Sequence, residues 1–271
     1  MAFDPDIGKV VLFGGAPFSG SPYTDTWEWD GVNWTRISPP TQPPGRTGAS
    51  LTWNPARNRL VLFGGEGGFG IIAPLNDTWE FDGSTWSRRI DAGTGPGPAY
   101  WMGADYDPVL GAEVVYGGDT GSRVSIDPFE TWTFNAPRLL PGLWTLAFRG
   151  NRPHPPATHE MAMAYVPSLV GTVAFGGFND RPYNETWQLG PAGWSQLHPP
   201  TSPPPMFGMA AATDPRGGLL VRSYPDAGSP SPGTWELAAC RLVPGAPPPP
   251  TAPSIPGAGG GGPPTNGPTY G

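Results

Sequence analysis

Residues 60–86 read LVLFGGEGGFGIIAPLNDTWEFDGSTW and combine four signals in a fixed order. A short unbroken apolar run ends in Gly64-Gly65, a variable segment leads to Asp77-Thr78-Trp79, an Asp-Gly turn follows, and a second tryptophan comes last. A short apolar run bounded by turns is typical of a strand buried on both faces, and Asp-Gly is a strong hairpin signal. The stretch therefore predicts three successive strands of a small antiparallel sheet.

The same order recurs about every 50 residues. Turn prolines at positions 5, 55, 108, 167 and 215 are separated by 50, 53, 59 and 48 residues. The glycine pairs are Gly14-Gly15, Gly64-Gly65, Gly117-Gly118 and Gly176-Gly177, with Tyr224-Pro225 in the fifth copy. The repeated tryptophans are Trp27, Trp79, Trp132, Trp187 and Trp235 at the first position, and Trp34, Trp86, Trp144 and Trp194 at the second. Four short strands in each period predict an all-β propeller.

The period explains an unusual composition. The 271 residues include 41 Gly and 40 Pro, about 30% of the chain, a fraction that indicates disorder when it has no period. Here most of them mark turns and strand ends. We expect a Cβ at the glycine pair to clash with a neighbouring segment, and the tryptophans to fill the space between blades. The acidic residue before each Thr-Trp is expected to bond nearby backbone.

This pattern resembles the kelch repeat, in five copies over residues 1–240. The resemblance implies four-stranded propeller blades that serve most often as a binding platform. The Gly-His and Trp-Asp signature of the WD40 propeller is not found in the sequence. The predicted blades span residues 1–42, 43–95, 96–154, 155–202 and 203–240, and residues 241–271, rich in Pro and Gly, are expected to form a disordered tail or linker.

The first and last copies are incomplete. Met1 aligns inside a first strand, without the lead-in segment that copies two and four carry, and the last copy has no second Trp. A strand upstream of Met1 would complete the last blade, which predicts that Met1 is an internal methionine or a cloning boundary. A signal peptide would then lie outside the sequence. The compartment is therefore not readable from the sequence, and a secreted or surface protein is one possibility.

Charge and cysteine content exclude several classes. The net charge is −7 and Lys9 is the single lysine, which argues against binding to nucleic acid. No apolar window is long enough for a membrane-spanning helix, so we expect no membrane insertion. One cysteine, Cys240, excludes an internal disulfide framework. We expect a monomer.

The candidate binding surface follows from strand order. In an antiparallel meander, the loops between strands two and three share one face with the connections between blades. These loops vary in length and composition, as binding loops on rigid scaffolds do. Their aromatic and arginine side chains are the candidate binding residues, because such residues are enriched at interface hot spots: Phe18, Tyr23, Phe69, Arg123, Phe129, Arg181 and Tyr183. The partner is a protein or a glycan. An alternative is that each side chain only covers its own loop.

Candidates for catalysis are weak. His154 and His159 lack a third ligand for a metal, and His159 falls in the lead-in where other copies hold Gly48 and Trp101. His198 is expected to be exposed. The sequence thus favours a non-enzymatic scaffold with no metal and no cofactor. One alternative is a copper enzyme resembling galactose oxidase, although Cys240 lies past the last Thr-Trp and the histidine stretch does not match a copper-ligand pair. Another is a purely structural spacer within a larger secreted or surface protein.

Overall fold

The structure, a computed structural model, describes residues 1–17, 20–68, 73–90, 95–121, 129–135, 142–150, 153–214, 216–222 and 234–237. The chain divides into two units, Met1–Ala239 and Cys240–Gly271, and the second unit lies outside the described residues. Within the described ranges the regular structure is all β. No helix in those ranges is long and apolar enough to cross a membrane.

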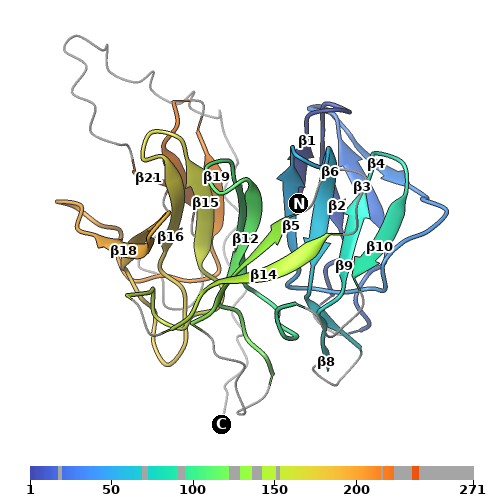
Figure 1. Cartoon of the computed structure of the whole chain (residues 1–271). Helices are drawn as coiled ribbons and strands as arrows, with labels where there is room; N and C mark the ends of the chain where they lie inside the picture. The colour runs from blue at the N-terminus through green and yellow to red at the C-terminus, as the bar shows by residue number, and fades with distance from the viewer. Residues whose placement is uncertain are drawn as a thin grey trace, which may run out of the picture. The chain divides into compact units, whose positions relative to one another are not determined.

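The first two sheets each contain four antiparallel strands, as Figure 1 shows at the blue end of the colour scale. The first has the order β1-β2-β3-β4, with bounds β1 (Ala2–Asp4), β2 (Lys9–Phe13), β3 (Thr26–Trp29) and β4 (Trp34–Ile37). The second has the order β5-β6-β9-β10, with bounds β5 (Ser50–Asn54), β6 (Arg59–Phe63), β9 (Thr78–Phe81) and β10 (Trp86–Ile90). A small hairpin of β7 (Glu66–Gly67) and β8 (Ala73–Pro74) lies between β6 and β9 in the chain.

The next three sheets repeat the order. The third comprises β11 (Gly103–Asp107), β12 (Ala112–Tyr116), β13 (Thr131–Asn135) and β14 (Leu143–Phe148). The fourth comprises β15 (Ala162–Val166), β16 (Gly171–Phe175), β17 (Thr186–Gly190) and β18 (Gly193–Leu197). The fifth has three described strands, β19 (Ala210–Thr213), β20 (Leu219–Arg222) and β21 (Thr234–Leu237). Every pair of neighbouring strands within these sheets is antiparallel.

The five sheets are the blades of a β-propeller, as the repeat predicted. First strands contact one another from blade to blade, in the order β1, β5, β11, β15 and β19, so they form the inner side of the blades. The second strands β6, β12 and β16 are buried almost throughout, which confirms the prediction made from their unbroken apolar runs. Their side chains divide between the clusters that fill the spaces on either side of a blade.

The first glycine of the pair is required by the next blade. Gly64 has a φ of +65°, and a Cβ built on it would lie 2.6 Å from the carbonyl oxygen of Ala99, in the segment that leads into blade three. Gly117 has a φ of +68°, and its Cβ would lie 2.3 Å from the carbonyl oxygen of Thr158, in the segment that leads into blade four. Both the positive φ and the close approach exclude a side chain. The predicted clash is confirmed.

Candidate binding face

In blades two, three and four the second tryptophan joins the blade to the preceding one. The indole Nε1 of Trp86 donates to Thr26 Oγ1 at 3.1 Å, that of Trp144 to Thr78 Oγ1 at 2.9 Å, and that of Trp194 to Thr131 Oγ1 at 2.8 Å. These three tryptophans are at most 5% exposed, so each buried indole donor has an acceptor within the joint. Trp34 is 44% exposed. The tryptophans of blades two, three and four thus fill the space between blades, as the sequence predicted.

The acidic residue of the repeat binds an indole, where the sequence had suggested backbone. In blades one to four its carboxylate accepts a hydrogen bond from the tryptophan two residues later. The four pairs are Asp25 with Trp27 at 2.8 Å, Asp77 with Trp79 at 2.7 Å, Glu130 with Trp132 at 3.0 Å, and Glu185 with Trp187 at 2.8 Å. The carboxylate therefore orients the first tryptophan of its own blade.

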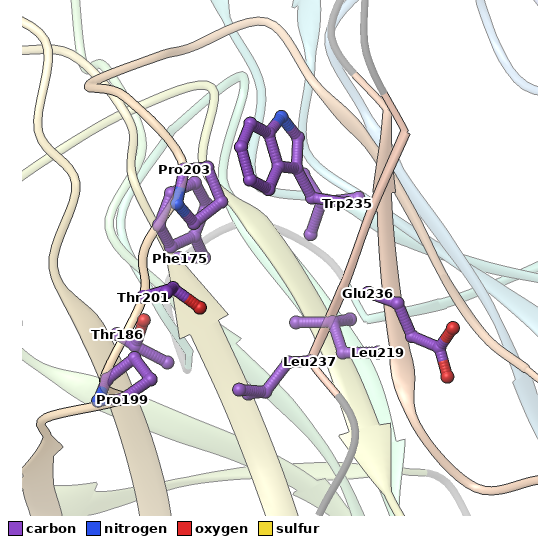
Figure 2. Close-up of a pocket in the computed structure, with 10 residues that line it drawn as sticks. Phe175, Thr186, Pro199, Thr201, Pro203, Leu219, Trp235, Glu236 and Leu237 are labelled. Atoms are coloured by element: carbon purple, nitrogen blue, oxygen red, sulfur yellow. The ribbon is translucent and has the colours of Figure 1, made fainter.

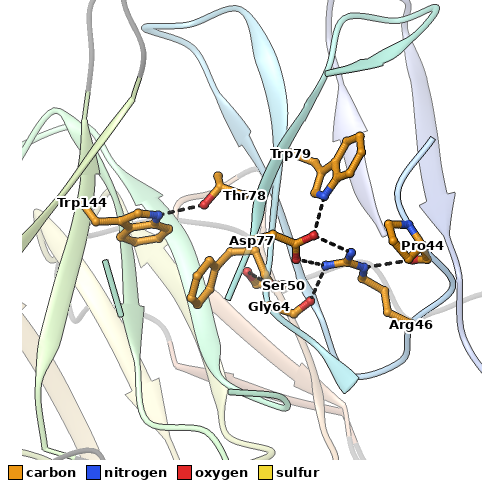
Figure 3. A network of polar contacts seen from close by, with 9 residues as sticks. Pro44, Arg46, Ser50, Gly64, Asp77, Thr78, Trp79 and Trp144 are labelled. Atoms are coloured by element: carbon orange, nitrogen blue, oxygen red, sulfur yellow. Dashed lines mark hydrogen bonds and ion pairs between the residues drawn. The ribbon is translucent and has the colours of Figure 1, made fainter. Parts of the chain in front are cut away.

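Blade two adds a buried arginine to this arrangement. The guanidinium of Arg46 donates to Asp77 Oδ1 at 2.6 Å and Oδ2 at 3.0 Å, and to the carbonyl oxygens of Gly64 at 2.9 Å and Pro44 at 3.1 Å (Figure 3). The Arg46 residue is 1% exposed. Burial alone would raise the pKa of Asp77, but the donors from Arg46 and Trp79 outweigh it and hold that pKa below its ordinary value.

A second group of titratable side chains lies inside blades two and three. Arg57 pairs with Glu80, which also accepts from Arg89 Nε at 2.8 Å. Glu113 is fully buried, and burial followed by the nearby carboxylates raises its pKa well above the ordinary value. Burial also raises the pKa of Asp105 to about 6, although its carboxylate accepts backbone bonds from Tyr106 and Tyr165. These groups belong to the packing between blades.

Lead-in segments and the loops that follow the glycine pairs lie at the same end of the blades. Thr47 pairs with Glu66, Tyr100 with Asp119 and His159 with Phe178 through isolated antiparallel bridges. In each pair a residue from the lead-in meets the residue just after the glycine pair of the same blade. This confirms the strand-order argument that placed both kinds of connection on one face, here named the loop face.

The loop face carries a continuous aromatic row. Ring centroids lie 4.8 Å apart for Tyr100 and Trp101, 5.7 Å for Trp101 and His159, 5.7 Å for His159 and Phe178, and 4.9 Å for Phe178 and Phe207. Trp101 is 37% exposed and Phe207 is 38% exposed. Five aromatic rings from three consecutive blades therefore form one continuous row of ring contacts, in which Tyr100 is buried and Trp101 and Phe207 are exposed.

A central pocket opens beside this row. Gly48, Trp101, Glu160 and Gly208 occupy equivalent positions in blades two to five, each with a φ between +56° and +65°. Their backbones form a chain: Trp101 N donates to Gly48 O at 2.7 Å, Glu160 N to Trp101 O at 2.7 Å, and Gly208 N to Glu160 O at 3.0 Å. The pocket that these residues line has a volume of about 370 Å³. A left-handed φ is uncommon for tryptophan and glutamate, and such strain is concentrated at functional sites.

Negative charge accompanies the aromatic row. Burial raises the pKa of Glu66, and the charge of Asp119 raises it further. Burial and a hydrogen bond with Asp119 raise the pKa of Tyr100. Glu160 adds a further carboxylate in the lining of the central pocket. The loop face therefore combines exposed aromatic rings with acidic groups.

The sequence-predicted binding residues fall in several places. Phe18, Phe69 and Arg123 lie outside the described residues. Tyr23 is 50% exposed, and its backbone N donates to Gly15 O at 2.8 Å. Phe129 is half-buried and packs on His154, with ring centroids 4.4 Å apart.

Arg181 and Tyr183 lie together on the loop of blade four. The guanidinium of Arg181 lies 5.3 Å from the centroid of the Tyr183 ring. The Tyr183 hydroxyl donates to Asp180 Oδ1 at 3.1 Å, and its backbone bonds to Gly177 and Met206. The structure thus gives Tyr183 contacts within its own loop and leaves Arg181 exposed on its ring.

The aromatic row itself was missed from the sequence. Trp101, His159 and Phe207 belong to lead-ins, and Phe178 follows a glycine pair. The signal was present, because Gly48, Trp101, Glu160 and Gly208 each stand seven residues before a turn proline. The structure also corrects one alignment: the equivalent of Gly48 and Trp101 in blade four is Glu160, and His159 stands one residue earlier.

The histidines have different surroundings. His154 Nδ1 lies 2.7 Å from the carbonyl oxygen of Pro155, His159 stacks within the aromatic row, and His198 is exposed as expected. In the part of the chain that the structure describes, no three His, Cys, Asp or Glu side chains are grouped closely enough to hold a metal ion.

Comparison with known families agrees with this architecture. The family model for the KLHDC2/KLHL20/DRC7 Kelch-repeats domain matches residues 6–216, which is more than half of the chain. The chain belongs to this kelch-repeat family. A kelch propeller is typically a protein-interaction module and is generally non-catalytic. A comparison with curated proteins gives no match.

Proposed function

We propose that this kelch propeller is a non-enzymatic scaffold that binds a protein partner on its loop face. The observation that carries the proposal is the aromatic row, whose exposed rings Trp101 and Phe207 lie beside the central pocket. Aromatic side chains at the centre of an interface supply large contact area at low entropic cost, so they are enriched among hot spots.

The backbone that carries the aromatic row suits this role because hydrogen bonds between blades hold it in place. Lead-ins are bonded to the glycine pairs of the preceding blade, as in Gly65 N to Ala99 O at 2.8 Å and Gly118 N to Thr158 O at 3.1 Å. Side chains that project from such a fixed backbone lose little further freedom on binding. The loop of blade four adds the exposed guanidinium of Arg181 to the same face.

The test compares two double variants as baits for partner capture. Trp101→Gly with Phe207→Ser removes the exposed rings, and glycine accepts the φ of +56° at position 101. Val109→Ser with Val170→Ser is the matched control, because these exposed valines lie in the turns between first and second strands, at the opposite ends of their blades.

The expected result is that cross-linked partners recovered with the wild-type protein are retained by the valine variant and lost with the loop-face variant. Both variants must melt as cooperatively as the wild-type protein. Equal recovery with the loop-face variant and the wild-type protein would place the binding surface elsewhere.

A further inference from the structure

Two pockets within the described residues have different surroundings. The groove between blades four and five is lined by Phe175, Leu219 and Leu237 among others (Figure 2). Phe175 and Leu219 are at most 3% exposed, and both belong to the hydrophobic cluster that packs these two blades together. The central pocket of the loop face, by contrast, is lined by the exposed Trp101 and by Glu160. We therefore examine the central pocket as the place where a charged group of a partner is recognised.

Two glycines of the central pocket leave room for its two large side chains. A Cβ built on Gly48 would lie 2.6 Å from Trp101 Cδ1, and a Cβ built on Gly208 would lie 3.2 Å from Glu160 Oε2. The backbone N of Glu160 donates to Trp101 O at 2.7 Å, so the indole and the carboxylate come from adjacent backbone positions of neighbouring blades. The pocket thus holds one aromatic ring beside one carboxylate.

The Glu160 carboxylate has no strong partner. Among the described residues, no lysine or arginine pairs with it and no hydrogen bond reaches its side-chain oxygens. His159 Nδ1 lies 3.5 Å from Glu160 Oε1, which is longer than a strong hydrogen bond. The side chain of Glu160 is 23% exposed, so much of its contact with water is lost. A ligand that brings its own N–H donors would compensate for that loss.

The charge around the pocket favours a cation. Glu66 and Asp119 follow the glycine pairs of blades two and three on the same loop face, and their negative charges interact. The whole chain carries a net charge of −7. A negative surface attracts cationic groups and repels anionic ones. The chemistry of the pocket is therefore that of a site for a positively charged group.

A guanidinium fits this pair of groups better than an ammonium does. A guanidinium is planar, so it stacks on an aromatic face while two of its N–H groups donate to one carboxylate. The chain contains both contacts in separate places. Arg46 donates to the two carboxylate oxygens of Asp77 at 2.6 and 3.0 Å, and the guanidinium of Arg181 lies 5.3 Å from the ring centroid of Tyr183.

We propose that the central pocket binds an arginine side chain of the protein partner, with its guanidinium stacked on Trp101 and paired with Glu160. The proposal rests on the loop-face function given above and adds the chemical identity of the anchoring residue. The volume of about 370 Å³ lies within the range of roughly 300–1,000 Å³ that is usual for ligand pockets. Arginine is also enriched at interface hot spots.

The probe for the test is the synthetic peptide acetyl-Gly-Ser-Arg-Ser-Gly-amide, titrated into the ¹⁵N-labelled full chain at pH 7. Two-dimensional NMR follows the indole N–H resonance of Trp101, which is assigned by its absence from the spectrum of Trp101→Gly. We expect a saturable change in this resonance, larger than that of any other indole, with a Kd on the order of 1 mM because the ligand is small.

Two further peptides identify the group that is recognised. Citrulline in place of arginine keeps the shape of the side chain and removes its charge, so we expect about tenfold weaker binding. Lysine keeps the charge without a planar fork, so its peptide should bind several-fold more weakly than the arginine peptide. Equal binding of the arginine and citrulline peptides, or of the arginine and lysine peptides, would overturn the assignment of a guanidinium.

A matched pair of protein variants locates the carboxylate. Glu160→Gln keeps the length of the side chain and removes its charge, so the arginine peptide should bind about tenfold more weakly and the preference over citrulline should disappear. Glu236→Gln is the control, because this carboxylate is 33% exposed in its side chain and lies outside the pocket lining. The NMR spectrum of each variant shows whether it is folded, and the peptide comparison on the wild-type protein decides the question if Glu160→Gln is not.

Partner capture separates this proposal from the loop-face function. Glu160→Gln as bait should recover less of each partner than wild type, and excess arginine peptide should displace those partners where the citrulline peptide does not. If Trp101→Gly with Phe207→Ser loses the partners while Glu160→Gln retains them in full, the loop-face function stands and the arginine anchor is excluded. Full recovery by the double variant contradicts the loop-face function itself, whatever the peptides show.

Discussion

Replacing Arg46 with methionine tests whether a buried ion pair holds blade two together. The substitution keeps an apolar side chain of similar length and removes the donors to Asp77, Gly64 and Pro44. Asp77 is 7% exposed and would retain the indole donor of Trp79, at 2.7 Å. Breaking one side of a buried pair leaves an uncompensated charge and costs about 3–5 kcal/mol. We expect Arg46→Met to lower the free energy of unfolding by that amount at pH 7.

The pH dependence separates the charge from simple packing. Because the folded-state pKa of Asp77 lies below its ordinary value of 3.8, the pair contributes stability above that value, and the contribution is lost as pH falls through the folded pKa. The difference between wild type and Arg46→Met should therefore be largest at pH 7 and shrink below about pH 4.

The assay is guanidinium unfolding followed by tryptophan fluorescence and by circular dichroism, and coincident transitions would support a two-state treatment. The double variant Arg46→Met with Asp77→Asn should be more stable than Arg46→Met at pH 7, because the stranded charge is gone. A cost below about 1 kcal/mol, or an equal cost at pH 7 and pH 3, would refute the ion-pair argument and assign Arg46 a packing role only.

Three further predictions test the packing within and between blades. Trp86→Ala should lower the free energy of unfolding by about 3–5 kcal/mol, because Trp86 is 1% exposed. Trp34→Ala should lower it by less than about 1 kcal/mol, because Trp34 is 44% exposed. Equal costs would contradict the role of Trp86 in joining blades one and two. Gly64→Ala should lower the melting temperature more than Gly8→Ala. Both glycines have a positive φ, but a Cβ at Gly8 meets nothing within 4 Å. Equal shifts in melting temperature would show that the close approach is not the reason for glycine at position 64. Glu113→Gln should be more stable than wild type at pH 7 and as stable as wild type at pH 4. The pKa of Glu113 is higher in the folded than in the unfolded chain, so ionisation of the unfolded chain destabilises the wild-type fold as pH rises. A stability difference that does not change with pH would contradict this raised pKa.

The repeat made the blades predictable, and the reason is local. The apolar run, the Gly-Gly pair and the Asp-Gly turn each specify backbone within one blade, so the strands follow from short stretches such as residues 60–86. The need for glycine at position 64 also follows from this pattern, because a buried strand end with no Cβ implies a close neighbour.

The candidate site was harder to predict because its contacts join residues from different blades. Trp101 and His159 are 58 positions apart in the chain, and their stacking depends on the rotation between blades three and four. Arg46 was hidden for another reason. No other copy carries an arginine at the equivalent position, where Ala99 and Thr158 stand, so comparison between repeats gave it no weight.

The contacts between blades run in one direction along the chain, from each blade to the blade before it. This direction explains which copies keep the repeated residues. The carbonyl that excludes a Cβ at Gly64 comes from blade three, and the indole that binds Thr78 comes from Trp144 of the same blade. Each blade therefore constrains the sequence of the blade before it. Trp34 shows the converse, because no described blade precedes it and its indole is 44% exposed, unlike the 1% of Trp86.

The same direction applies to the joint between blades four and five. Blade four keeps a glycine at position 176 because Met206 O of blade five lies 2.7 Å from the position of a Cβ there. Blade five thus supplies the lead-in that the joint requires, and β21 supplies Leu237. The glycine at position 176 is therefore required by blade five, as the glycines at positions 64 and 117 are required by blades three and four.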